Sequence, residues 1–233
     1  MADAVLGVAA HAASRTGTVR HSAIVRVTHW ITTACFLALL VSGMEIVISH
    51  PRLYWGENGN VLTPALFSFP IPSSRATVPT GYGYVLPDQN GWSRYLHFEA
   101  AWVLVFTGAV YVISGLFSGH FRKNLLPDAR SAAVVADASS YNLLQRLAYL
   151  VVVFVLFPLV VWTGLAMSPA FVSAIPSTVT VFGGRQSART LHFLLSVSLV
   201  VFVLVHVAMI WRAGFGSRVT AMIKGAASAR EPE

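Results

Sequence analysis

The chain has 233 residues, of which 55% are hydrophobic and only 11% are charged, and its mean hydropathy is +0.66. This balance excludes an ordinary soluble domain and is typical of a membrane protein. The formal net charge is +7. Because no basic run alternates with aromatic residues, we attribute this charge to membrane topology and to anionic lipid or cofactor contact, and we expect no nucleic acid partner.

Four segments are long and apolar enough to cross a bilayer core of about 30 Å, which takes roughly 20 helical residues. They are residues 27–49, 95–117, 144–167 and 191–211. Inside lipid a backbone must satisfy its own hydrogen bonds, so each segment is predicted to be a helix. The predicted fold class is all-α, an integral membrane four-helix bundle.

The basic residues lie unevenly on the two sides of these segments. Eleven of the sixteen lysines and arginines lie on the side of the two termini, and five lie on the other side. By the positive-inside rule both termini are predicted to be cytoplasmic. The N-terminal segment has no signal-peptide pattern, so we expect the first helix to remain as an anchor in the bacterial inner (cytoplasmic) membrane.

The spans divide the chain into three parts. We expect residues 1–23 to form a cytoplasmic arm, residues 24–224 the four-helix domain, and residues 225–233 a cytoplasmic tail. The first outer connection, about residues 51–91, is long and contains six prolines. Loops of this length usually carry function, so we expect it to bind a periplasmic partner. Ser187 is expected to cap the last helix.

Four histidines lie in the predicted helices at two depths. With the termini inside, His29 and His206 lie near the inner surface, and His97 and His192 lie near the outer surface. His192 and His206 are fourteen residues apart, which corresponds to about 21 Å of rise and a rotation of roughly 40° from the starting direction. These two histidines therefore share one face of the last helix, at its opposite ends.

Two imidazoles from different helices at each depth provide what bis-histidine haem ligation requires. The single cysteine, Cys35, excludes an internal disulfide and the CxxCH attachment of c-type haem. For any one histidine, a hydrogen bond to a neighbour is an equal alternative, but it does not account for the match of all four. Gly43 and Gly108 lie near the histidine faces of their helices and would give a macrocycle room, with close helix packing as the alternative.

Several motifs resemble the bacterial cytochrome b561 type, a family that includes membrane cytochrome subunits of nickel-iron hydrogenases, formate dehydrogenases and thiosulfate reductases. The motifs are RVTHW, YLHFEAAW, LQRLAY, TGLAMSP, RTLHF and VLVH. The similarity covers residues 19–224 and implies four helices, two b-type haems, and the ligand pairs His29 with His206 and His97 with His192. The stretches PRLYWGE, FSGHFRK and GGRQSARTLHF also resemble cytochromes found beside periplasmic molybdopterin oxidoreductases of the sulfite-oxidase type. The long first outer loop departs from the compact members of the family.

Cationic side chains at the helix ends are candidates to neutralise haem propionates. They are Arg94, Arg185 and Arg189 on the outer side and Arg20 and Arg26 on the inner side. Ordinary helix-end charge is the alternative for each of them.

A quinone is expected at the inner haem, where the third helix begins with Gln145, Arg146 and Tyr149. These side chains could line a pocket for the quinone head, and plain interfacial anchoring is the alternative.

The sequence thus predicts a membrane di-haem b cytochrome that transfers electrons between a periplasmic redox enzyme, of the molybdopterin-dependent class by resemblance, and the membrane quinone pool. Two histidines saturate an iron, which favours electron transfer over substrate chemistry. The protein would then be the electron-transfer subunit of a quinone-linked oxidoreductase. The alternatives are a stand-alone superoxide:quinone oxidoreductase and a haem-free metal or proton pathway.

Overall fold

The structure is a computed structural model that describes residues 21–60, 62–70, 90–124 and 143–225. Its elements, in chain order, are α2 (Ala23–Ser49), β1 (Arg52–Leu53), β2 (Phe67–Ser68), α3 (Asn90–Phe117), α4 (His120–Asn124), α5 (Leu143–Val151), the π-helix η2 (Val152–Leu156), α6 (Phe157–Leu165), α7 (Pro169–Ala174), α8 (Ser177–Thr180), α9 (Arg185–Arg212) and α10 (Phe215–Lys224).

Four helical runs in this part of the chain are long and apolar enough to cross a membrane, namely α2, α3, α9 and the run from α5 through α6. This confirms the predicted all-α membrane bundle. Both α2 and α9 begin earlier than the hydrophobic segments do. The added first turns, Ala23–Arg26 and Arg185–Ala188, contain polar residues, which a search for apolar runs leaves out. The hydroxyl of Ser22 caps α2 by accepting the amide of Val25 at 3.4 Å.

The third span is an α-helix interrupted by one π-helical segment, η2. Pro158 follows this segment at the start of α6. Proline has no N–H to donate to the preceding turn, and a locally wider turn relieves the clash of its ring with that turn. The hydrophobic pattern predicted one helix here and gave no sign of this change in winding.

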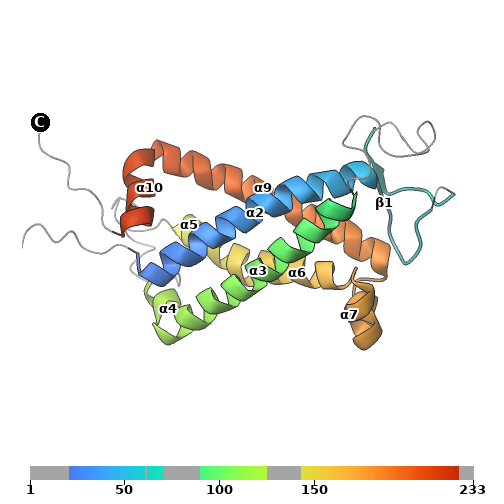
Figure 1. Cartoon of the computed structure of the whole chain (residues 1–233), viewed down its shortest axis with the longest axis horizontal. Coiled ribbons are helices and arrows are strands. Elements are labelled where there is room, and N and C mark those ends of the chain that lie inside the picture. The colour runs from blue at the N-terminus through green and yellow to red at the C-terminus, as the bar shows by residue number, and fades with distance from the viewer. Residues whose placement is uncertain (1–20, 61, 71–89, 125–142, 226–233) are drawn as a thin grey trace, which may run out of the picture.

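The four long helices pack as two antiparallel pairs. One pair is α2 with α3, and the other is α5–α6 with α9 (Figure 1). Backbone contacts are concentrated within the pairs and are sparse between them. The interior of the bundle between the two pairs is therefore formed mainly by side chains.

The two ends of the bundle carry different short elements (Figure 1). At the hairpin end, β1 and β2 pair antiparallel, with Arg52 opposite Ser68, and a small core of Ala166, Val179 and Ala188 joins α7 and α8 to the long helices. At the α10 end, α4 and α10 lie near the start of α2. Many large apolar side chains between these ends are exposed, as expected for helices that face lipid.

Candidate functional site

The rings of His97 and His192 face each other near the hairpin end of the bundle. His97 comes from α3 and His192 from α9, so one ring comes from each helix pair. The ring centroids are 6.2 Å apart and the ring planes are inclined by 60°. The structure therefore brings together the two histidines that the sequence placed at one depth.

The imidazole of His192 is held in one tautomer by α6. Its Nδ1 lies 2.9 Å from the carbonyl oxygen of Val160 and 3.1 Å from the hydroxyl of Thr163. A carbonyl oxygen only accepts hydrogen bonds, so Nδ1 carries the proton and donates it. The lone pair of the His192 imidazole is then on Nε2, the nitrogen that remains available for a metal.

Ser42 of α2 holds His97 in the same way. The Ser42 hydroxyl lies 3.0 Å from Nδ1 of His97 and donates its own proton to the carbonyl oxygen of Ala38 at 2.7 Å. A hydroxyl has one proton, so towards His97 the Ser42 oxygen accepts. His97 thus also has a protonated Nδ1 and a lone pair on Nε2. No sequence pattern had indicated Ser42 or Thr163 as partners of the histidines.

The other two membrane histidines lie towards the α10 end and differ in their partners. Nδ1 of His206 lies 3.0 Å from the hydroxyl of Tyr149, and the His206 ring stacks on Phe202 at 5.8 Å. His29 has an edge contact with Trp30 at 5.3 Å, and its buried Nδ1 has no hydrogen-bond partner among the described residues. His206 is within electrostatic range of His29, although no ring contact joins them in the described part.

Glycines lie beside the histidine rings of the hairpin end. A Cβ atom added to Gly43 would meet Cε1 of His97 at 3.7 Å, and one added to Gly164 would meet Cε1 of His192 at 3.4 Å. A Cβ added to Gly108, one of the two glycines expected to make room, would meet nothing within 4 Å. The rings of His97 and His192 therefore pack closely against Gly43 and Gly164, whereas the space beside Gly108 is open.

Of the arginines expected on the outer side, Arg94 and Arg185 are exposed and Arg189 is half-buried. Arg94 and Arg189 are close enough for their like charges to interact. No salt bridge to either is seen within the described ranges. Two adjacent cations without a carboxylate partner form a suitable surface for an anionic group.

The inner arginine Arg26 lies at the α10 end and bonds to α10. Its Nη1 donates to the carbonyl oxygen of Ile223 at 2.7 Å, and Nε1 of Trp30 donates to the carbonyl oxygen of Met222 at 3.3 Å. The Arg26 side chain therefore caps the last turn of α10, where carbonyl groups lack helical partners. Arg20 lies outside the described residues.

Of the residues proposed for quinone, Tyr149 is engaged with His206 and Arg146 is half-buried on the same turn of α5. Gln145 belongs to α5, and its side chain lies outside the described part of the structure.

The loop after β1 closes over the start of α9, and we call this contact the loop clamp. The carbonyl oxygen of Gly56 accepts the amides of Gln186 and Ser187 at 2.9 and 3.2 Å, and Glu57 Oε2 accepts the amide of Arg185 at 3.1 Å. The expectation that Ser187 caps α9 is wrong, because its hydroxyl accepts the amide of Gly56 at 2.7 Å. A distant segment thus satisfies the free amides of this helix.

The loop clamp leaves no room for a side chain where α9 begins. Gly184 has a φ of 124°, and a Cβ atom there would lie 2.5 Å from the carbonyl carbon of Gly56. One turn later, the hydroxyl of Thr190 donates to the carbonyl oxygen of Tyr54 at 2.7 Å. The clamp therefore connects the hairpin to the helix that carries His192.

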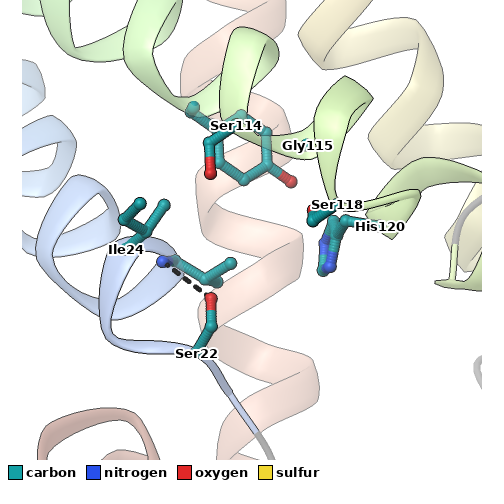
Figure 2. Close-up of a pocket in the computed structure, with 8 residues that line it drawn as sticks. Ser22, Ile24, Ser114, Gly115, Ser118 and His120 are labelled. Carbon is teal, nitrogen blue, oxygen red and sulfur yellow. Dashed lines mark hydrogen bonds between the residues drawn. The ribbon is translucent and has the colours of Figure 1, made fainter.

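A small polar cavity of about 20 Å³ lies at the α10 end, between the start of α2 and the end of α3 (Figure 2). Ser22, Ser114, Ser118 and His120 contribute to its walls. Burial lowers the pKa of His120, which favours its neutral form. The volume suits about one water molecule, and none of the four membrane histidines lines it.

Taken together, the long apolar helices and the facing imidazoles define a membrane-spanning helical protein with a paired-histidine centre. The family model for prokaryotic cytochrome b561 matches residues 20–225, and the chain belongs to this family. A similar protein is the "Putative protein-methionine-sulfoxide reductase subunit YedZ1" of Azospira oryzae, which is 31% identical over 222 residues, or 88% of this chain and 96% of that protein. No solved structure matches the chain.

The protein is therefore a multi-pass membrane cytochrome of electron transport, and its family implies b-type haem. The hairpin-end site fits such a group. His97 and His192 would hold it, because their rings come from different helix pairs with centroids 6.2 Å apart, and each has Nδ1 hydrogen-bonded, which leaves Nε2 for iron.

Proposed function

We propose that the protein is a di-haem b cytochrome that transfers electrons across the membrane, in which His97 and His192 would hold one haem iron and His29 and His206 the other. The observation that carries the proposal is the 6.2 Å separation of the His97 and His192 rings, both with Nδ1 engaged as a donor. At the second site, support comes from the electrostatic proximity of His29 and His206.

Bound haem would supply a one-electron carrier. The chain's own residues hold the ligands still. Ser42, Val160 and Tyr149 fix three of the four imidazoles, and the space beside Gly108 is open. Arg94 and Arg189 would neutralise the haem carboxylates at the hairpin end.

The experiment that tests this proposal is a pyridine haemochrome assay on the purified protein. We expect a haem-to-chain ratio near two, because four ligands in two pairs make two saturated sites. A ratio near one would remove the His29–His206 site, and a ratio near zero would overturn the proposal. Free haem titrated into an His97→Ala, His29→Ala double variant serves as the control for adventitious binding.

We further propose that the electron partner is a periplasmic redox enzyme of the molybdopterin-dependent class. Support comes from the similar protein of Azospira oryzae, whose name describes a subunit of a reductase, and from three motifs that resemble cytochromes of this kind. The asymmetry of basic residues supports cytoplasmic termini in the bacterial inner membrane. The hairpin end is then periplasmic, and its long loop lies on the side of the partner.

The membrane quinone pool is the proposed partner at the α10 end, beside His206. Arg146 and Tyr149 lie on the start of α5, and Tyr149 contacts this histidine directly. A quinone head needs hydrogen-bond donors near its oxygens and a flat apolar wall, and this set provides both. Quinone reduction here would take up protons from the cytoplasm while electrons cross the membrane from the hairpin end.

Arg146→Leu is expected to slow reoxidation of reduced haem by quinone by about tenfold, the cost of roughly one charge-assisted hydrogen bond. Haem content and reduction from the periplasmic side should not change, and Gln145→Leu should act in the same direction. The measurement is stopped-flow absorbance with a soluble quinone. Arg52→Leu, at an exposed arginine of β1 at the hairpin end, is the matched control, and a larger effect there would assign the quinone to that end instead.

Two other functions make different predictions. A stand-alone superoxide:quinone oxidoreductase would be reduced by superoxide without any soluble subunit, whereas the proposed function requires co-purification of one. A haem-free metal or proton pathway would show no haem absorption. Among the described residues no group of three or more His, Cys, Asp or Glu side chains is gathered to hold a metal ion.

A further inference from the structure

The four membrane histidines differ in what their Nδ1 atoms can donate to. If each binds iron through Nε2, its Nδ1 carries a proton and looks for an acceptor. Hydrogen bonds already present in the bundle supply acceptors for three of the four histidines, and the two pairs are unequal.

Both histidines of the hairpin-end pair have a strong acceptor. His192 donates to the carbonyl oxygen of Val160 at 2.9 Å, with the Thr163 oxygen at 3.1 Å. Thr163 accepts here, because its own proton is donated to the carbonyl oxygen of Leu159 at 2.8 Å. His97 donates to the Ser42 oxygen at 3.0 Å. Each of these oxygens has a lone pair directed at an imidazole N–H.

The α10-end pair is poorer in acceptors. His206 donates to the phenolic oxygen of Tyr149 at 3.0 Å, and a phenol accepts less well than an aliphatic hydroxyl or a carbonyl because its lone pair is shared with the ring. Nδ1 of His29 is buried and has no hydrogen-bond partner in the described part of the chain. In this pair one imidazole therefore has a weak acceptor and the other has none among the described residues.

An acceptor at Nδ1 makes the imidazole a stronger electron donor to iron. It draws the Nδ1 proton outward and raises the basicity of Nε2, which stabilises the ferric state more than the ferrous state. Hydrogen bonding around the axial ligands is one of the means by which a protein sets the reduction potential of a haem. A pair with fewer and weaker acceptors should hold its electron more tightly.

We propose that the haem of the His29–His206 pair has the higher reduction potential of the two, and that Tyr149 is the residue that positions and tunes it. This inference rests on the proposed two-haem function. A single electron would then favour the α10-end haem, so the potential difference would direct electrons away from the hairpin end. Ser42 has the corresponding role at the hairpin end, through His97.

The test is a spectropotentiometric titration of the purified holoprotein in the absence of partner and quinone. In the wild type we expect two waves, with one-electron distribution favouring the α10-end haem by about tenfold, which is 59 mV for a one-electron couple. The wave that His29→Ala removes is assigned to the α10 end. The reverse order of the two waves would overturn the proposal.

Two variants then test the residues. Tyr149→Phe should shift the equilibrium further towards the α10-end haem by about fivefold, the factor expected for one typical hydrogen bond, and should leave the other wave unchanged. Ser42→Ala should raise only the hairpin-end wave and narrow the gap. Tyr111→Phe, a tyrosine of α3 whose ring lies against His120 and Phe121, is the matched control and should move neither wave.

The haem-to-chain ratio of the same samples distinguishes a failure of the tuning role of Tyr149 from a failure of the two-haem function. A ratio of two with Tyr149→Phe moving both waves, or neither, would overturn the tuning role and leave the two-haem function standing. A wild-type ratio below two would instead count against the proposed function itself. If Tyr149→Phe loses haem, Tyr149→Trp replaces it, and because an indole N–H cannot accept, it should raise only the α10-end wave. Ser42→Thr keeps the accepting hydroxyl and should move neither wave, and the opposite result for either variant would overturn the tuning role.

Discussion

His192→Ala is expected to remove one of the two haems completely and to lower the haem-to-chain ratio from two to one. His97→Ala should give the same spectral loss, because these two side chains lie on opposite sides of one site with ring centroids 6.2 Å apart. His29→Ala and His206→Ala should remove the other haem. The measurement is the reduced-minus-oxidised absorption spectrum together with the haemochrome ratio.

His120→Ala is the matched control for these variants. His120 is a half-buried histidine at the α10 end that lines a small cavity and lies against Tyr111, outside the four spans. This variant should retain both haems. The ligand assignment would be wrong if His29→Ala and His97→Ala produced the same spectral loss, or if His120→Ala lost a haem.

Loss of the exposed apolar side chains of the hairpin should abolish electron exchange with the soluble partner. Leu62, Leu66 and Phe67 are 89%, 62% and 51% exposed, and they lie outside the membrane spans. Apolar side chains gathered on such a surface are typical of a protein contact. Changing all three to Ser is expected to slow haem reduction by the native soluble subunit at least about a hundredfold, the loss of roughly three buried anchors.

The haem spectra of this triple variant should be unchanged, because the loop clamp that secures the start of α9 uses backbone groups of Gly56 and the carboxylate of Glu57 instead. Phe117→Ser, which changes a side chain 90% exposed at the opposite end of the bundle, is the control. Deleting the middle of the loop, residues 63–80, tests the same surface in the same assay. Partner-driven reduction at the wild-type rate in the triple variant would exclude the hairpin as the docking surface.

The sequence predicted the long helices and the shared depth of His97 and His192 because both depend on local properties. Hydropathy identifies a span wherever about twenty residues are apolar, and helical periodicity fixes which residues share a face. The arrangement of Gly43 beside His97 follows from the same two rules.

What the sequence did not reveal depends on contacts between distant segments. Ser42 and Thr163 look like ordinary small polar residues that bond the preceding turn, and they do so, but each hydroxyl oxygen also accepts from a histidine of a neighbouring helix. The sequence feature that could have indicated these contacts is a small polar residue in the span next to one that contains a histidine. Arg26 bonds α10 and Ser187 bonds Gly56 because the chain folds back onto both helix ends, which no local pattern predicts.

Hydrogen bonds join α9 to the third span, among them one from His192 to Thr163 and one from His206 to Tyr149. The two histidines are fourteen residues apart in α9, and Thr163 and Tyr149 are fourteen residues apart in the third span. One residue inserted between His192 and His206 would turn one of them by about 100° and advance it by about 1.5 Å relative to the other. Evolution can therefore change the distance between the two centres only in steps of about a whole helical turn, and only if two antiparallel helices change together.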